Sequence, residues 1–200
     1  VGSEMCIRDS SSIEAGEYDL NMENHKLGKL INQTVKAHQD QARLRNITLN
    51  VQLEEDIDIV VDASAFSIIL SNFVTNALKH SPSNSEILIK NDLEDDFLTT
   101  LSVIDHGKGI PKKYRDRVFE RFFRVDKGRA KHSGGTGLGL AISKHLARLM
   151  GYEVGMKPNK PNGSRFWISV NYASSEEEKS LTPELALSLI HISEPTRRIL

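Results

Sequence analysis

Two amides in this chain, Asn72 and Asn76, have the chemistry to hold a hard metal ion. They lie four residues apart in a predicted helix and therefore share one of its faces. A carboxamide oxygen suits Mg²⁺, which prefers oxygen ligands and keeps water and phosphate oxygens in its shell. Lys79 and His80 follow at the end of the same helix. Taken alone, the pair is better explained as capping or solvated amides.

A second motif, Asp105-His-Gly-Lys-Gly-Ile110, follows a predicted strand. Its glycines, Gly107 and Gly109, permit positive φ and a close approach of the backbone to a ligand. A carboxylate at the strand end can accept a hydrogen bond from an exocyclic amine such as that of adenine. The alternative, an ordinary turn that begins with Asp, is the more common origin of such a pattern alone.

The third motif, Gly134-Gly-Thr-Gly-Leu-Gly139, opens a predicted helix over residues 138–150. Free N–H groups and the positive dipole end at a helix N-terminus suit a phosphate. The motif is not a Walker loop, because Leu140 and Ala141 stand in the Lys and Ser/Thr positions. It also lacks the last glycine of G-x-G-x-x-G. A flexible loop before a helix remains the alternative for this segment by itself.

Between these glycine-rich motifs lies a basic and aromatic segment, Arg117-Val-Phe-Glu-Arg-Phe-Phe-Arg124. We expect Phe119, Phe122 and Phe123 to anchor a mobile segment to the body of the domain. The cations that give this part of the chain a local positive field are Arg121, Arg124, Lys127, Arg129 and Lys131. A basic lid on an aromatic hinge suits closure over a polyphosphate. A nucleic-acid groove is the alternative, but the basic patch is short.

The composition excludes several classes of protein. The 200 residues carry 26 Lys+Arg and 27 Asp+Glu, and a net charge of -1 gives no global attraction to nucleic acid or anionic membranes. The single cysteine excludes a disulfide framework. No apolar run reaches the roughly 18 residues of a membrane span. At 38% hydrophobic residues the chain is expected to be globular and soluble.

Both ends of the chain resemble a translated sequencing adapter. Glu4–Asp9 encoded as GAG ATG TGT ATA AGA GAC, followed by AG, has a reverse complement that reads Leu-Ser-Leu-Ile-His-Ile, and this matches residues 187–192. The alternative is a short amphipathic helix over 185–192. We therefore expect residues 1–10 and 187–200 to be non-native, and both natural ends of the protein to lie outside this chain.

Hydrophobic periodicity predicts helices over 27–45, from Phe66 to before Pro82, and over 138–150. Asp62 is the expected N-cap of the second helix. Alternation predicts strands over 47–53, 57–61, 86–91, 98–104, 152–157 and 164–170. The expected fold class is α+β, a two-layer sandwich in which a mixed, mostly antiparallel sheet packs on about three helices.

The order and spacing of the four motifs resemble the ATP-binding catalytic domain of sensor histidine kinases, in the GHKL or Bergerat-type ATPase superfamily. The resemblance covers residues 27–172, and the stretch from Ser11 to Leu20 also looks like that family's connector. It implies a connector over 11–26 that leaves dimerisation helices absent from this chain. It further implies a catalytic domain over 27–173 and a polar tail over 174–186.

The resemblance implies a role for each motif. Asn76 would ligate Mg²⁺ with Asn72 assisting, Lys79 would contact phosphate and Arg124 would reach the terminal phosphate. Asn72, Lys79 and Arg124 would be the catalytic residues. The ATP-contacting set would be Asn72, Asn76, Lys79, His80, Asp105, Gly107, Gly109, Ile110, Phe119, Arg124, Gly135, Thr136, Gly137, Leu138, Gly139 and Leu140. His106 departs from the family, which often has Asn there.

The implied function is to bind Mg-ATP and donate its γ-phosphoryl group to a histidine on the absent dimerisation domain, for relay to an aspartate of a response regulator. The full-length protein would be a homodimer anchored in the inner membrane of a bacterium. This fragment would be cytoplasmic and would contact neither nucleic acid nor membrane. The alternatives are a non-catalytic nucleotide-sensing module and a hydrolytic ATPase. Hydrolytic relatives carry a Glu base where Asn72 stands, and an amide cannot act as a general base.

Overall fold

A computed structural model of the chain describes residues 19–95, 97–125 and 136–173. The two segments expected to be adapter-derived, the polar tail and the first half of the expected connector, residues 11–18, lie outside these ranges. Three helices are present within them: α2 (Leu27–Leu44), α3 (Ala63–His80) and α4 (Gly139–Leu149). A 3-10 helix, η1 (Lys112–Arg117), lies between β5 and α4 in the chain. Within the described ranges, none of the helices is long and apolar enough to cross a membrane.

The sheet has seven strands, in the order β1-β3-β7-β5-β4-β2, with β6 also paired to β7. The strands are β1 (Glu23–Lys26), β2 (Ile47–Gln52), β3 (Asp58–Val61), β4 (Ser85–Leu93), β5 (Leu98–Ile104), β6 (Glu153–Pro158) and β7 (Ser164–Ala173). Only β2 and β4 pair in parallel, and every other pair is antiparallel. The prediction of a mixed, mostly antiparallel sheet is confirmed.

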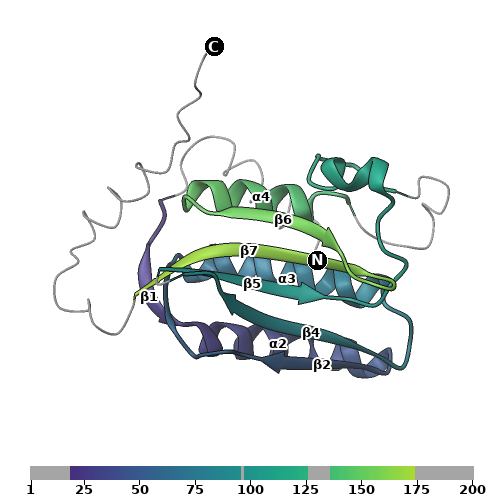
Figure 1. The fold of residues 1–200 in the computed structure, drawn as a ribbon, viewed down its shortest axis with the longest axis horizontal. Helices are drawn as coiled ribbons and strands as arrows, with labels where there is room; N and C mark the ends of the chain where they lie inside the picture. Colours follow the sequence, from purple (N-terminus) through teal and green to yellow (C-terminus); the bar gives the residue numbers. More distant parts are fainter. Residues whose placement is uncertain (1–18, 96, 126–135, 174–200) are drawn as a thin grey trace, which may run out of the picture.

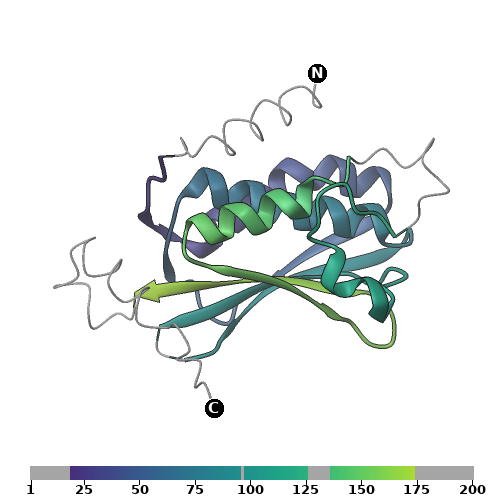
Figure 2. The ribbon, with the colours of Figure 1, turned by 90° about the horizontal axis from the view of Figure 1, so that it is seen from above.

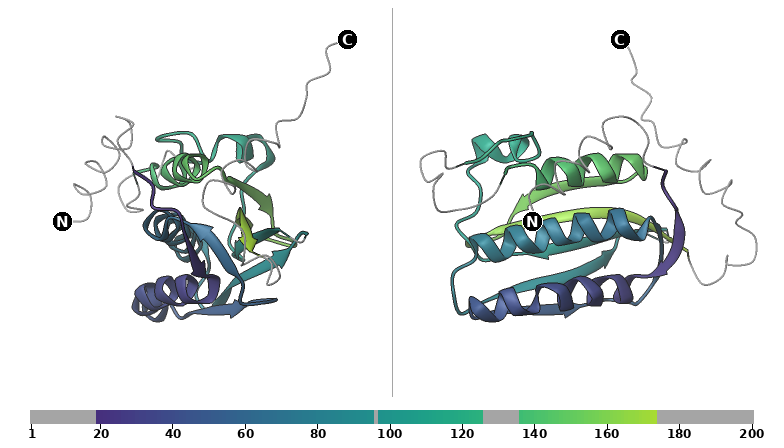
Figure 3. Two further views of the ribbon diagram at one scale, coloured as in Figure 1. Left: turned by 90° about the vertical axis from the view of Figure 1, so that its left-hand side faces the viewer. Right: turned by 180° about the vertical axis from the view of Figure 1, so that it is seen from behind.

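The helices cover one face of the sheet and form the second layer (Figures 1 and 2). Seen from behind, α3 lies between α2 and α4 and runs along the middle of the sheet (Figure 3). The largest fully buried side chains come from both layers, with Phe66 and Phe73 on α3 and Phe166 on β7. The rings of Phe73 and Phe166 lie 5.7 Å apart between centroids, in contact across the two layers. The α+β sandwich is therefore as predicted.

The N-terminus of α3 is fixed as the sequence indicates. The Asp62 carboxylate accepts from the backbone N–H of Ala65 at 2.8 Å, which caps the helix. Its other oxygen accepts from the backbone N–H of Asn21 at 2.9 Å. One buried carboxylate thus joins the segment that leads into the domain to the helix that carries the two amides.

Two elements were not predicted. Residues 23–26 were expected to belong to a connector, but they form β1, which pairs antiparallel with β3. The strand is polar and three of its four residues are exposed, so its sequence has no apolar alternation to reveal it. Its hydrogen bonds to the edge of the sheet stabilise it instead. The other element is η1, a basic stretch with no buried residue.

Candidate functional site

The four motifs meet around the C-terminal half of α3. Asn72, Asn76, Lys79 and His80 lie on its last three turns, and Asp105 begins the loop after β5. Gly107 packs so closely on the end of α3 that a Cβ there would lie 2.5 Å from the His80 carbonyl oxygen. Since only glycine permits this approach, the loop of residues 105–110 is attached directly to the helix that carries the amides.

Asp105 is buried, with 2% of its surface exposed. Its Oδ1 accepts from the backbone N–H of Gly107 at 2.8 Å and from that of Ser164 at 3.2 Å. No hydrogen bond to Oδ2 is made by any residue that the structure describes. Burial raises the pKa of the Asp105 carboxyl, and the two backbone hydrogen bonds and His106 partly oppose that rise. One oxygen is therefore held by the protein and the other is available to a donor such as an exocyclic amine.

Asn72 ties α3 to the start of α4. Its Nδ2 donates to the Gly139 carbonyl oxygen at 2.9 Å and to the Ser143 Oγ at 3.1 Å. A Cβ on Gly139 would lie 3.1 Å from the Asn72 Oδ1, so the glycine also permits close packing. The amide thus positions the N-terminal turn of α4, and the first backbone N–H groups of a helix have no partners within that helix. The sequence did not predict this contact, which joins residues 67 positions apart.

Asn76 is half-buried one turn further along α3. Its carboxamide makes no hydrogen bond with the described residues, so its oxygen can serve as a ligand. Those residues contain no cluster of three or more His, Cys, Asp or Glu side chains that could hold a metal. Mg²⁺ takes oxygen ligands and keeps several waters and phosphate oxygens beside few protein ligands, so the single amide oxygen of Asn76 fits that ion.

Lys79, at the end of α3, lies within electrostatic reach of a second cation. Burial and then the charge of Arg124 lower the pKa of the Lys79 ammonium. Arg124, which is half-buried, is therefore near enough for its charge to act on Lys79. Two positive charges held together favour an anion between or beside them.

The aromatic segment is anchored by two of its three predicted phenylalanines. Phe119 meets the buried Phe166 edge-on, with 6.3 Å between ring centroids. Phe123 lies 5.6 Å from the ring of Tyr114, and the Arg117 guanidinium lies 4.5 Å from the Phe123 centroid. Phe122 differs from the prediction, because it is 70% exposed and does not pack on the hydrophobic core of the described residues.

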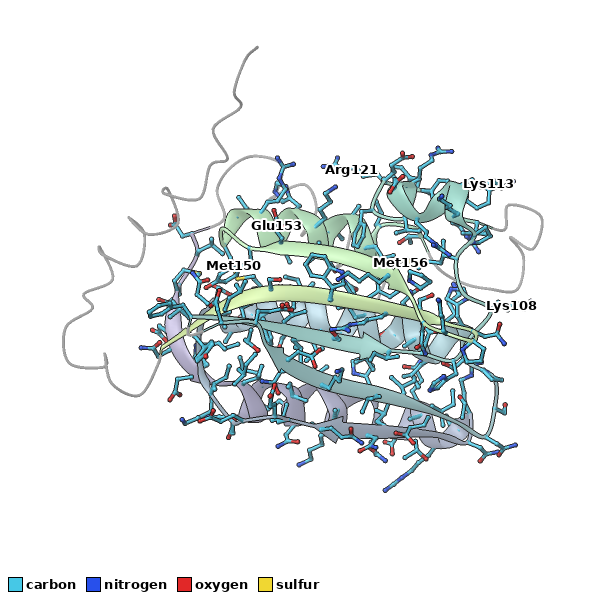
Figure 4. All side chains as sticks on the ribbon, viewed as in Figure 1. Lys108, Lys113, Arg121, Met150, Glu153 and Met156 are labelled. Carbon is cyan, nitrogen blue, oxygen red and sulfur yellow. The ribbon has the colours of Figure 1, made fainter. Side chains whose placement is uncertain are left out.

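Phe122 instead acts through its backbone. Its φ is +59°, and its N–H donates to the Gly137 carbonyl oxygen at 3.0 Å. Gly137 has φ +72°, and a Cβ there would lie 3.0 Å from the Phe122 Cα. This bond joins the aromatic segment to the glycine-rich turn before α4. Figure 4 labels two cations near this turn: Lys113 belongs to η1, and Arg121 lies between η1 and α4.

The remaining predicted residues lie around these contacts. Thr136 is exposed, whereas Leu138, Leu140 and Ile110 are half-buried. The Ile110 carbonyl oxygen accepts from the Arg115 Nε at 3.0 Å, which ties the loop to η1. His80 is exposed at the end of α3. Gly135, with Lys127, Arg129 and Lys131 of the predicted lid, lies outside the described residues.

Comparison with known proteins identifies the family to which this chain belongs. The family described as "Histidine kinase-, DNA gyrase B-, and HSP90-like ATPase" matches residues 61–174. Sensory/regulatory protein RpfC of Xanthomonas campestris pv. campestris is 33% identical over 182 residues, which cover 88% of this chain and 25% of that protein. Sensor histidine kinase WalK of Bacillus subtilis is 36% identical over 126 residues, which cover 62% of this chain and 21% of that protein.

A solved structure shares the fold. Full-length ShkA, crystallised in complex with AMPPNP, superposes with a TM-score of 0.72 at 26% sequence identity, over 82% of this chain and 34% of that one. This chain thus spans about a quarter of the length of RpfC and about a fifth of that of WalK.

Proposed function

Because the chain belongs to the histidine kinase-, DNA gyrase B- and HSP90-like ATPases, we propose that it is the ATP-binding catalytic domain of a sensor histidine kinase. It binds Mg-ATP and donates the γ-phosphoryl group to a histidine on a dimerisation domain. The proposal rests on the two carboxylate oxygens of Asp105: backbone N–H groups hold Oδ1, and Oδ2 is left to accept a hydrogen bond from a ligand. A site for adenine therefore lies beside one for phosphate at the end of α3.

Each motif then has a part in binding. Asp105 accepts from the adenine amine, and Gly107 and Gly109 let the loop approach the base. Lys79 and Arg124 attract the phosphates, and the backbone around Gly137 and Gly139 lies against them. Asn76 would hold the Mg²⁺, and a bound Mg²⁺ would neutralise part of the negative charge of the phosphates. The other proposed contacts are Asn72, His80, Ile110, Phe119, Gly135, Thr136, Leu138 and Leu140.

The chain favours donation of the phosphoryl group over hydrolysis. Hydrolysis needs a base to activate water, and Asn72 presents an amide whose nitrogen already donates to Gly139 and Ser143. An amide has no basic site at neutral pH. In the proposed transfer, an imidazole nitrogen of the acceptor histidine forms a bond to the γ-phosphorus while the bond from that phosphorus to the leaving ADP oxygen breaks.

We propose that the acceptor histidine lies in dimerisation helices upstream of the connector over 11–26, in a protein that is homodimeric and anchored in the inner membrane. The phosphoryl group would then pass to an aspartate of a response regulator. The relatives named above are a sensory/regulatory protein and a sensor histidine kinase, which supports a role in sensory signalling through a histidine kinase.

Calorimetric titration of the 200-residue chain with ATP, with and without Mg²⁺, tests the proposal. We expect binding that Mg²⁺ strengthens, and Asn76→Ala should abolish that strengthening. Asn50→Ala, on β2, where the side-chain amide donates to Glu86, is the matched control and should bind as the unchanged chain does. An unchanged chain that binds no ATP would refute the proposal. Release of phosphate without any histidine acceptor would favour a hydrolytic ATPase.

A further inference from the structure

The turn between β6 and β7 packs on the loop that begins with Asp105. The backbone N–H of Asp105 donates to the Ser164 carbonyl oxygen at 2.9 Å, and the Ser164 N–H donates back to the Asp105 Oδ1. Gly163 has φ +119°, and a Cβ there would lie 1.9 Å from the Asp105 carbonyl oxygen. Gly109 is also near, since its Cβ would lie 3.0 Å from the Gly163 carbonyl oxygen. The turn between β6 and β7 is therefore packed tightly against the loop and fixes its position.

One side chain of that turn reaches both of the first two residues of the loop. The Asn159 Nδ2 donates to the Asp105 carbonyl oxygen at 3.0 Å and lies 3.3 Å from the His106 Nδ1. Its own backbone N–H donates to the Gly163 carbonyl oxygen at 3.1 Å, which closes the turn and holds the side chain in place. Asn159 is half-buried, whereas the neighbouring Lys160 and Asn162 are exposed.

These contacts fix the orientation of both side chains. An amide nitrogen only donates, so the His106 Nδ1 must accept, and the neutral ring carries its proton on Nε2. The reversed amide would place Oδ1 against the Asp105 carbonyl oxygen, and two acceptors would then face each other. The two hydrogens of one amide group thus serve two acceptors on neighbouring residues.

We propose that Asn159 is a positioning residue for base recognition, and that it sets the direction in which the Asp105 carboxylate meets a purine amine. The proposal rests on the proposed function, because it concerns the adenine end of the same site. In the proposed role, Asn159 makes no direct contact with the nucleotide. It acts through the Asp105 main chain and through the tautomer of His106, a residue that differs from the Asn often present in the family.

Comparison of two nucleotides separates positioning from general stability. Inosine triphosphate carries an oxygen where ATP carries its exocyclic amine, so only ATP can donate from that position to the Asp105 Oδ2. We expect Asn159→Ala to weaken Mg-ATP binding by about three- to tenfold, the effect of one hydrogen bond. Its effect on Mg-ITP should be less than about twofold, so that the preference for ATP falls. Asn162→Ala, in the same turn, should leave both affinities unchanged.

Two results would overturn the inference while leaving the proposed function intact. The first is an Asn159→Ala chain that binds ATP as tightly as the unchanged chain or weakens ATP and ITP equally. The second needs no variant and no nucleotide: ¹⁵N NMR of the unchanged chain should show an unprotonated His106 Nδ1 and a protonated Nε2. The opposite tautomer would contradict the proposed contact. Loss of all nucleotide binding by the unchanged chain would instead refute the proposed function.

Discussion

The two ends of the proposed ATP site are held in different ways. At the base end, backbone groups of Gly107 and Ser164 hold a carboxylate that is almost fully buried. At the phosphate end, Lys79 and Arg124 bring two like charges together, and the neighbouring Phe122 is largely exposed. Backbone contacts thus hold the base end, whereas the phosphate end brings together two like charges, which favour binding of an anion beside them.

The largest expected difference between the two ends comes from adding one methyl group to each. Gly163→Ala places a Cβ inside the contact distance of the Asp105 carbonyl oxygen, at a φ of +119° that side chains rarely adopt. We expect the free energy of unfolding to fall by about 4 kcal/mol or more. Gly137→Ala meets the Phe122 Cα at 3.0 Å. It should cost about 1–2 kcal/mol, the usual penalty of a left-handed residue.

Urea denaturation of both variants measures this difference. If Gly137→Ala destabilised the chain as much as Gly163→Ala, the phosphate end would be as rigid as the base end, and the comparison would be wrong.

The second prediction separates stability from binding at the base end. Asp105→Asn keeps an oxygen for the Gly107 and Ser164 N–H groups but replaces the Oδ2 acceptor by a donor. We expect ATP affinity to fall by about 100-fold, since a donor then faces the adenine amine. Calorimetry of the variant and the unchanged chain measures the loss.

The pH dependence of unfolding provides the control for that variant. Burial raises the pKa of the Asp105 carboxyl in the folded chain, so the folded state holds this proton more tightly than the unfolded state does. The stability of the unchanged chain is therefore lowered as pH rises from the unfolded pKa of about 3.9 through the higher folded value. Asp105→Asn should match or exceed the unchanged chain in stability at pH 7. A variant much less stable at pH 7 would contradict this account.

The smallest effect is expected at the phosphate end. Arg124→Gln removes the charge that helps to lower the pKa of Lys79, so that pKa should rise in the chain without nucleotide. The ¹³Cε shift of Lys79 during a pH titration follows it. Lys113→Gln, on the exposed face of η1, is the control and should leave the Lys79 titration unchanged. An unchanged Lys79 titration in Arg124→Gln would show that the two charges act independently.

The sequence was sufficient for the elements that bury apolar faces. The strand over Leu98–Ile104 was predicted with its observed bounds, and α2 and α4 ended within one residue of the prediction. Asp62 was identified as the cap of α3 because a capping residue acts within its own turn. Periodicity and capping are local, so a single sequence carries them.

The features that were missed depend on residues distant in the chain. β1 is stabilised by its pairing with β3, and nothing in its polar residues predicts that. The site amide Asn72 was placed correctly on α3, but its bonds to Gly139 and Ser143 arise only when α4 packs beside α3. Asn159 had no signal beyond its place in a turn, because its partners lie 53 and 54 positions away.

The two bonds of Asp62 have a mechanical consequence. The carboxylate holds the chain at Asn21 and the first turn of α3 at Ala65, and the amides Asn72 and Asn76 lie further along the same helix. A pull on the chain at Asn21 acts on the bond to Asp62 and on the β1–β3 pairing, in which Glu23 faces Val61, the residue before Asp62. Both connections end at the start of α3, so a displacement of the incoming chain reaches the proposed Mg²⁺ ligand along the axis of that helix.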